Sequence, residues 1–502
     1  MIKLKTLQKP KFKDLNQGNG AGSPVLKALW EKFDLSLLLT QCGINKHSGT
    51  PAWIIIFAYV IGLSKGCTSV LNIAKHACGD KILKPMFGNL DVTQYSMSRF
   101  FTKTYNWSKF SQKRVERLQH EEDTRLTDGD VITLDDTKVA HPFGKKIPFL
   151  CWLFDSSDKI NIWCMNVMAT YAVLKSGLEY PIFYRIWRKT DNQDEKKTKI
   201  DLSIQMLQDI RKSFNGKLWV AMDRWFLCKD LFQWLVANNY DWVTKAKRNT
   251  ALYRREIERV TGRERFVPVK PGELIREVFF KLSKVSANTD GLCAISIPEI
   301  YIKLPVQVVG KRGKIVTKQK TVPIAAVVAM RLKEDIEVIG NDITMKDKED
   351  AAIYRGAYLI ISNRFDIPYE ALNTYVKRWC IEVFFRTAKQ ELGLTNCHST
   401  SEAHHHAHIE LLFTAETLLS YAKWELNGNE KGIEEGFTHG EMVRNFFNAQ
   451  YTIVEKTTGG LKTIQIYFDI DVRQFARLLD NFWPQDIKLR WLPGIQLLPR
   501  TA

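Results

Sequence analysis

A strand, a helix and a second strand follow one another closely in the middle of the chain. Lys217–Met222 (KLWVAM) is a short apolar run, Lys229–Asn238 has helix-like apolar spacing, and Asp241–Lys245 is strand-like again. Short connections between such elements are typical of a βαβ unit, whose two strands lie parallel in one sheet. The pattern therefore predicts an α/β fold built on a sheet with parallel neighbours.

Further strand-like runs lie on both sides of this unit. They are Val131–Leu134, Phe149–Phe154, Ile160–Val173 and Tyr358–Ser362. Residues 251–346 interrupt the rhythm, because they are rich in Val, Ile, Lys and Thr, and they are predicted to form a mostly β insertion. The expected core therefore has a first part at 127–250 and a second part at 347–425.

Both ends of the chain are predicted to be helical, over residues 1–126 and 426–502. The longest apolar run, Ala52–Leu63, is too short to span a bilayer and indicates a buried helix. Met97–His120 mixes basic and aromatic residues. That segment fits a helix lying against a phosphate backbone, and it fits an ordinary solvated helix equally well.

The net charge is strongly positive, at +18, which favours a polyanionic partner. Nucleic acid is the commonest such partner, and an anionic membrane surface is the alternative. The basic N-terminus lacks the apolar segment of a secretory signal. The nine cysteines are scattered without a CxxC pair, which fits a reducing cytoplasm.

Two acidic residues follow predicted strands. Asp135 comes after VITL, and Asp223 comes after KLWVAM. The carboxyl ends of strands in open α/β sheets are where catalytic groups collect, and carboxylates there suit Mg²⁺. The alternative is that each Asp only forms a turn.

A polar row is predicted on a long helix from about Pro368 to Leu392. Because each helical residue turns by about 100°, Tyr375, Arg378, Glu382 and Lys389 fall on one narrow stripe. The other faces of this helix are largely apolar, which indicates burial, and a buried polar row needs a purpose. The alternative is a solvated helix with ion pairs between successive turns.

The spacing Tyr-x2-Arg-x3-Glu-x6-Lys resembles the signature of the hairpin-forming, cut-and-paste insertion-sequence transposases of the DDE class. The Asp135-Asp136-Thr137 and Asp223-Arg224 segments also resemble the contexts of the first and second Asp in that family. The resemblance covers residues from about 130 to 400. It implies a ribonuclease-H-like core, with the β insertion lying between the second Asp and the Glu.

The resemblance implies a DNA-cutting and DNA-joining enzyme. Asp135, Asp223 and Glu382 would hold two Mg²⁺ ions, for which Mn²⁺ is expected to substitute. The enzyme would nick an element end, form and reopen a hairpin, and join the end to target DNA. The residues expected to contact DNA are Tyr375, Arg378, Lys389, Tyr358 (as a base-stacking aromatic), Arg224, Lys245, Lys247 and Arg248.

The partners implied by the resemblance are terminal inverted repeats, target DNA and a second copy of the chain. A homodimer would pair two element ends, in the cytoplasm and nucleoid of a prokaryote. Two other interpretations stay open. One is a catalytically idle, sequence-specific DNA-binding protein derived from a transposase, and the other is a structure-specific nuclease that joins no strands.

Two local ambiguities complete the sequence analysis. Asp135 and Asp136 point to opposite faces if their strand continues, and the Asp-x-Thr context favours Asp135. A histidine group resembles a metal cluster, but it lacks the HExxH pattern and a neighbouring Cys pair. We therefore expect a helix face near DNA or solvent for His404, His405, His406 and His408.

Overall fold

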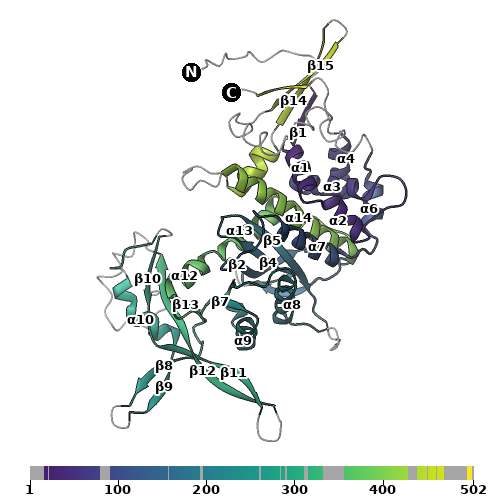
Figure 1. Ribbon diagram of the computed structural model, residues 1–502. Coiled ribbons are helices and arrows are strands. Elements are labelled where there is room, and N and C mark those ends of the chain that lie inside the picture. Colours follow the sequence, from purple (N-terminus) through teal and green to yellow (C-terminus); the bar gives the residue numbers. More distant parts are fainter. Residues whose placement is uncertain are drawn as a thin grey trace, which may run out of the picture.

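The computed structural model describes most of the chain. The described residues are 16–20, 22–79, 91–155, 158–190, 192, 196–258, 262–282, 284–288, 291–309, 315–331, 356–427, 438–448, 450–458, 461–468 and 495–499. They form a mixed α/β structure with a large mixed sheet (Figure 1). None of the described helices is long and apolar enough to cross a membrane.

Five neighbouring strands form the part of the large sheet that positions the site. In spatial order they are β5 (Glu179–Trp187), β4 (Ile160–Val173), β2 (Val131–Ala140), β6 (Leu218–Met222) and β7 (Tyr240–Lys245). β2, β6 and β7 run parallel, whereas β4 is antiparallel to both β2 and β5. Helix α9 (Lys229–Ala237) connects β6 to β7, so the predicted βαβ unit is confirmed.

The predicted end of the first strand is wrong. β2 does not stop at Leu134 but continues to Ala140. The reason is a difference between its two neighbours: the parallel partner β6 ends at Met222 opposite Leu134, while the antiparallel partner β4 pairs with β2 as far as Ala140. Asp135 therefore stands at the first position of β2 that has lost its parallel neighbour.

The segment predicted as an insertion is mostly β, with one helix, α10 (Pro271–Leu282). Its strands are β8 (Leu252–Ile257), β9 (Glu264–Val269), β10 (Leu292–Ser296), β11 (Ile300–Val309) and β12 (Ile315–Arg331). β12 pairs with β13 (Tyr358–Ser362), which in turn pairs with β7. The strands of the insertion therefore continue the core sheet beyond β13. At the other end of the strand order, β3 (Cys151–Asp155) pairs with β4.

The N-terminal region is helical, as predicted. Its helices are α1 (Ser23–Lys32), α2 (Leu35–Gln41), α3 (Ala52–Ser64), α4 (Val70–Gly79), α6 (Gln94–Phe101) and α7 (Trp107–His120). α3 is buried over nearly its whole length, which confirms a core helix. The segment Met97–His120 is two helices, because the Asn106 side chain accepts a hydrogen bond from the Lys109 amide (2.9 Å) and starts α7.

Three basic residues of α7 form ion pairs within the protein. Lys113 pairs with Glu116 (2.7 Å), and Arg117 pairs with Glu121 (2.6 Å). Arg114 is buried and donates to Glu410 (2.9 Å) on α14 (Glu402–Asn427), which packs against β5 and α3. These contacts favour the structural interpretation of this helix over a role in holding DNA.

The predicted single helix from Pro368 to Leu392 is two helices, α12 (Pro368–Val376) and α13 (Trp379–Gln390). Between them the Arg378 amide donates to the Tyr375 carbonyl (3.0 Å), and the Cys380 amide donates to the Lys377 carbonyl (3.1 Å). These hydrogen bonds, which join residues three positions apart, interrupt the α-helical hydrogen-bond pattern without Pro or Gly. Tyr375 therefore belongs to a different helix from Glu382.

The prediction of a helical C-terminal region is wrong for its last part. After α15 (His439–Glu441) and a π-helix (Met442–Phe447), the described residues form strands: β14 (Gln450–Thr458), β15 (Leu461–Phe468) and β16 (Ile495–Pro499). With β1 (Asn16–Asn19) they make a second sheet of four described strands. Alternating polar and apolar residues around Gly459-Gly460 are the hairpin signal that the prediction overlooked.

Candidate active site

Asp135 lies in β2, and Asp223 directly follows the neighbouring parallel strand β6. The parallel register pairs Leu134 with Met222, so the next residue of each chain segment is one of the two carboxylates. Neighbouring strands lie about 4.8 Å apart. Asp223 also caps a 3₁₀ turn, Arg224–Phe226, because its carboxylate accepts a hydrogen bond from the Trp225 amide (3.2 Å).

Helix α13 brings Glu382 to the same place. It packs on β2 and β4, with Phe384 stacked on Tyr171 of β4 at 5.1 Å between ring centroids. The Arg378 guanidinium, at the start of α13, bridges two carboxylates: it donates to Asp135 (3.1 Å) and forms an ion pair with Glu382. Arg378 thus links Asp135 to Glu382, and the pairing of β2 with β6 places Asp223 on the strand next to that of Asp135.

Asp136 points away from this group. Its carboxylate accepts hydrogen bonds from Asn166 (2.6 Å) and from Lys199 (2.9 Å). Alternation along β2 therefore places Asp135 beside Arg378 and Asp136 beside Lys199. The sequence did not point to Asn166 or Lys199, because both meet Asp136 only through strand pairing and the packing of α8 (Lys199–Arg211) on β4 and β5.

The pKa of Asp135 is raised to about 7, mainly by burial; the carboxylates of Asp136 and Asp223 also raise it, whereas Arg378 and the hydrogen bond from the Asp136 amide lower it. Asp135 consequently holds a proton more readily than an ordinary Asp. Concentrating acidic groups at a partly buried site costs stability, and such an arrangement is characteristic of functional sites.

We expect Asp135→Asn to stabilise the protein at pH 8. The pKa of Asp135 is higher in the folded than in the unfolded state, so its contribution to stability falls as pH rises from about 4 to about 7. The substitution removes that cost, and the melting temperature should rise by about 2–4 °C. The control Asp136→Asn should lower it, because Lys199 loses its partner. An equal decrease of the melting temperature in both variants would contradict the prediction.

Tyr375, Tyr358 and Lys245 form a row of contacts that begins at Arg378. The guanidinium carbon of Arg378 lies 5.6 Å from the Tyr375 ring centroid, and the Tyr375 and Tyr358 rings are 6.3 Å apart. The Lys245 ammonium lies 4.6 Å from the Tyr358 ring centroid. Burial lowers the pKa of Lys245, with Arg224 acting in the same direction and Asp223 opposing.

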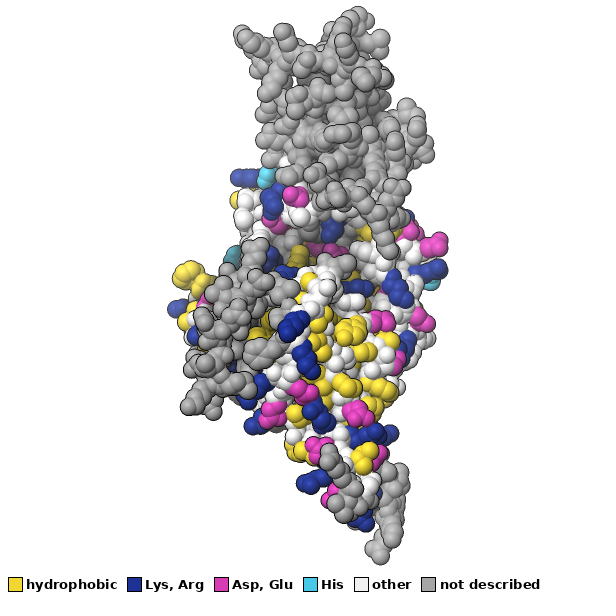
Figure 2. Space-filling model, turned by 90° about the vertical axis from the view of Figure 1, so that its left-hand side faces the viewer, with side chains coloured by type: hydrophobic (Ala, Val, Ile, Leu, Met, Phe, Trp, Pro, Cys, Tyr) yellow, Lys and Arg dark blue, Asp and Glu magenta, His cyan; other side chains and the backbone are white. Residues whose placement is uncertain are grey.

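The remaining predicted DNA contacts lie farther out. Lys389 is separated from Glu382 by about two helical turns, and its pKa is lowered by burial while Asp155 opposes the shift. Arg224 and Arg248 are exposed, and Lys247 is half-buried in the turn after β7. Figure 2 shows Lys and Arg side chains spread over one face, with Asp and Glu side chains between them.

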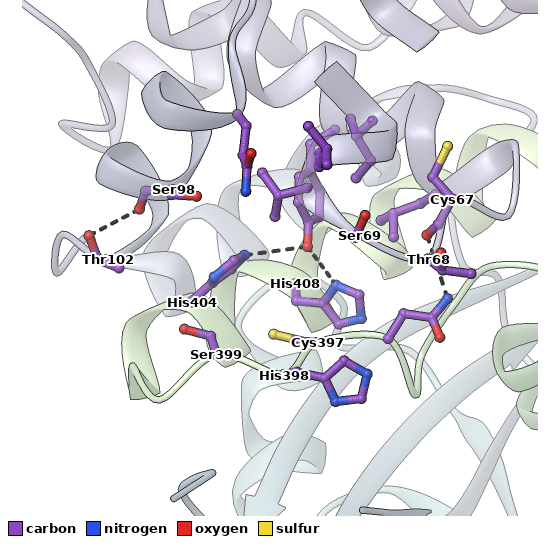
Figure 3. A pocket seen from close by; sticks show the side chains of 17 residues that line it. Cys67, Thr68, Ser69, Ser98, Thr102, Cys397, His398, Ser399, His404 and His408 are labelled. Atoms are coloured by element: carbon purple, nitrogen blue, oxygen red, sulfur yellow. Dashed lines mark hydrogen bonds between the residues drawn. The ribbon is translucent and has the colours of Figure 1, made fainter. Parts of the chain in front are cut away.

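His404, His405 and His408 are buried and His406 is half-buried, so the expectation of a helix face near DNA or solvent is wrong. The Tyr59 hydroxyl donates to His408 (2.8 Å), and the other ring nitrogen of His408 donates to the Gly393 carbonyl (3.0 Å). His404 contacts the same hydroxyl (3.4 Å) and stacks on Phe101. His404 and His408 line a pocket of about 300 Å³ (Figure 3).

These histidines should make the protein sensitive to acid. Burial lowers the pKa of His404 to about 4 and that of His408 to about 3. The unfolded chain then takes up more protons below about pH 6.5, so stability is lost as pH falls below that value. Urea unfolding of His408→Gln and wild type at pH 7.5 and 5.5 checks this. Between pH 7.5 and pH 5.5, the free energy of unfolding should fall more in the wild type than in His408→Gln, by on the order of 1 kcal/mol. Equal decreases in the two proteins would contradict the prediction.

Among the described residues, no three His, Cys, Asp or Glu side chains are close enough together to hold a metal ion as they stand. The donor set nevertheless fits a hard cation, because all three candidate ligands are carboxylates. In this structure the positive charge between Asp135 and Glu382 comes from Arg378, whose Nε is buried without a hydrogen-bond partner.

Part of the chain is similar to a known protein family. Residues 190–418 match the family model described as the transposase DDE domain, a segment that includes Asp223 and Glu382 but begins after Asp135. The match supports a DDE transposase. No curated protein matches the chain. Among solved structures, the chain is similar to a piggyBac transposase synaptic complex with hairpin DNA, at 10% identity and a TM-score of 0.39, covering 86% of this chain and 82% of that one.

Proposed function

We propose that this protein is a DNA transposase that cuts and joins phosphodiester bonds by metal-dependent chemistry. One observation carries the proposal: Asp135 and Asp223 directly follow Leu134 and Met222, the last register pair of the parallel strands β2 and β6, and Arg378 links Glu382 to Asp135. The match of residues 190–418 to the transposase DDE domain supports the same class. The strand order β5-β4-β2-β6-β7, with three parallel strands, supports a ribonuclease-H-like core.

Asp135, Asp223 and Glu382 would hold two Mg²⁺ or Mn²⁺ ions. Bound ions of this kind activate an attacking oxygen and stabilise the leaving oxygen during in-line displacement at phosphorus. The residues of the chain itself position the ligands. β2 and β6 hold the two aspartates on a rigid sheet, and the packing of α13 on β2 and β4 fixes the helix that carries Glu382.

The cationic and aromatic groups beside the carboxylates would bind the DNA strand. Arg378 offers a planar set of donors that matches a phosphate group. Tyr375 and Lys245 lie within reach of the same substrate, and Tyr358 stays a candidate base contact. Arg224, Lys247, Arg248 and Lys389 would contact phosphates farther along, consistent with the net charge of +18.

We further propose the hairpin route, in which the freed 3′-hydroxyl of one strand attacks the opposite strand at the element end. The resemblance of Tyr375, Arg378, Glu382 and Lys389 to the hairpin-forming family supports this step. A homodimer that pairs two terminal inverted repeats before joining them to target DNA completes the proposal, with residues 1–126 contributing to end binding.

A gel assay with purified protein and the DNA ends that flank its own gene tests the proposed function. With Mg²⁺ we expect nicked and then hairpin-ended products, and with EDTA we expect bound but uncut DNA. Nicks without hairpins would favour a structure-specific nuclease. Binding without cleavage in either Mg²⁺ or Mn²⁺ would favour an idle DNA-binding protein.

A further inference from the structure

A guanidinium lies at the position where the proposed metal site requires a cation. Arg378 donates to the Asp135 carboxylate (3.1 Å) and forms an ion pair with Glu382, one helical turn farther along the chain. The Arg378 side chain is 13% exposed and that of Asp135 is 18% exposed, so water screens their contact only weakly. One arginine therefore neutralises two of the three proposed ligands at the same time.

The two carboxylates cannot hold Arg378 and a divalent ion in the same way at the same time. Mg²⁺ requires its ligand oxygens at about 2.0–2.1 Å in a near-octahedral arrangement. The guanidinium instead bridges the Asp135 and Glu382 oxygens, and among the described residues no three candidate ligands are close enough together to hold an ion as they stand. Two positive groups between these carboxylates would also repel each other. Binding of Arg378 and binding of an ion are therefore competing states of one site.

The bridging position leaves one donor of Arg378 unsatisfied. Its Nε is buried and has no hydrogen-bond partner among the described residues, and a buried donor without an acceptor costs free energy. A phosphate group accepts two parallel hydrogen bonds from an arginine, whose donors form a planar fork. Tyr375 and Lys245, where the proposed DNA strand would lie, belong to the same row of contacts as Arg378. A DNA phosphate is therefore a second partner that can compete with the carboxylates for this guanidinium.

We propose that Arg378 is an internal counterion that keeps divalent ions off Asp135 and Glu382 until DNA draws its guanidinium onto a phosphate. The inference rests on the proposed function and adds regulation to it. DNA and the metal each favour the state in which Arg378 has left the carboxylates, so each should tighten the binding of the other. The consequence is an enzyme that binds its metal weakly before it has bound an element end, which limits cleavage of other DNA.

Titration of the full chain with Mn²⁺ tests the proposal, with the free ion measured by electron paramagnetic resonance. Without DNA, Arg378→Gln should bind Mn²⁺ on the order of 10-fold more tightly than the wild type, because Gln does not neutralise the carboxylates. With the element end bound, this difference should shrink to about 2-fold, since Arg378 of the wild type then pairs with a phosphate. Glu382→Gln should weaken Mn²⁺ binding both with and without DNA, as expected for an ion held at this site.

Arg386→Gln is the matched control. Arg386 is an exposed residue of α13, one turn after Glu382, and its guanidinium carbon lies 5.7 Å from the Trp379 ring centroid. Removing this charge should change the Mn²⁺ affinity by less than about 2-fold, because solvent screens an exposed cation. Melting temperatures identify any variant that misfolds. If Arg378→Gln misfolds, Arg378→Lys takes its place and should bind Mn²⁺ about 3-fold more tightly than the wild type, because an ammonium lacks the planar fork that bridges two carboxylates.

The outcomes distinguish this inference from the proposed function. If the wild type cuts the ends but Arg378→Gln binds Mn²⁺ no more tightly than the wild type without DNA, the counterion is wrong and the proposed function stands. A difference in Mn²⁺ affinity that stays the same with DNA bound would mean that Arg378 remains on the carboxylates, and it would also overturn the inference. If the wild type neither binds Mn²⁺ in the presence of DNA nor cuts the ends, the proposed function fails and the inference fails with it.

Discussion

Replacing Glu382 by Gln is expected to lower the rate of strand cleavage by at least about 10³-fold, because a neutral amide replaces one of three carboxylates at the proposed metal site. Loss of about 4 kcal/mol of charge stabilisation in the transition state corresponds to that factor. Affinity for the DNA end should change by only a few fold, since Gln keeps the size of Glu. Single-turnover cleavage and gel-shift titrations of the same preparation measure the two quantities.

Glu391→Gln is the matched control. Glu391 follows the same helix, α13, and forms an ion pair with Arg444 away from Asp135. Its loss should leave cleavage unchanged, because surface ion pairs contribute little. Cleavage by the Glu382→Gln variant at the wild-type rate would remove this residue from the proposed site.

Arg114→Ala is expected to lower the free energy of unfolding by about 3–5 kcal/mol, because it leaves the Glu410 carboxylate buried without its ion-pair partner. Burial already raises the pKa of Glu410, and Arg114 acts against that shift. The carbonyls of Pro181 (3.1 Å) and Ile182 (2.8 Å) also lose a donor. Urea unfolding at pH 7.5 measures the loss.

Two further variants test the cause of this loss. Arg117→Ala removes two more exposed ion pairs made by the same helix, with Asp34 and with Glu121, and should cost less than about 1 kcal/mol. Arg114→Met combined with Glu410→Leu should recover much of the stability, because no charge is left buried. A loss below about 1 kcal/mol in Arg114→Ala would show that the pair does not tie α7 to α14 and β5.

Local patterns were sufficient for several elements. The apolar run ending at Met222 and the helix after it predicted the βαβ unit, and Tyr358–Ser362 was predicted with the bounds that the structure has. Ala52–Leu63 was correctly predicted as a buried helix. The predictions for these segments are correct because periodicity and composition act over a few residues, and helix and strand preferences are set over the same distance.

Two of the failures have long-range causes. The extent of β2 depends on β4, which is about thirty residues away in sequence. His404 and His408 of α14 were expected to face solvent or DNA, yet they contact Tyr59 and Phe101 from the N-terminal helices. The other failures are local: the break between α12 and α13 has no Pro or Gly, and the hairpin signal around Gly459-Gly460 was overlooked.

By itself, the sequence determined the α/β class, most core elements and the three carboxylates on which the proposed function rests. Only the tertiary structure decided which side chains meet. Strand alternation and pairing turn Asp135 toward Arg378 and Asp136 toward Lys199. The physical reason is that residue type specifies local conformation and possible chemistry, whereas contacts between distant residues depend on sheet register and helix packing.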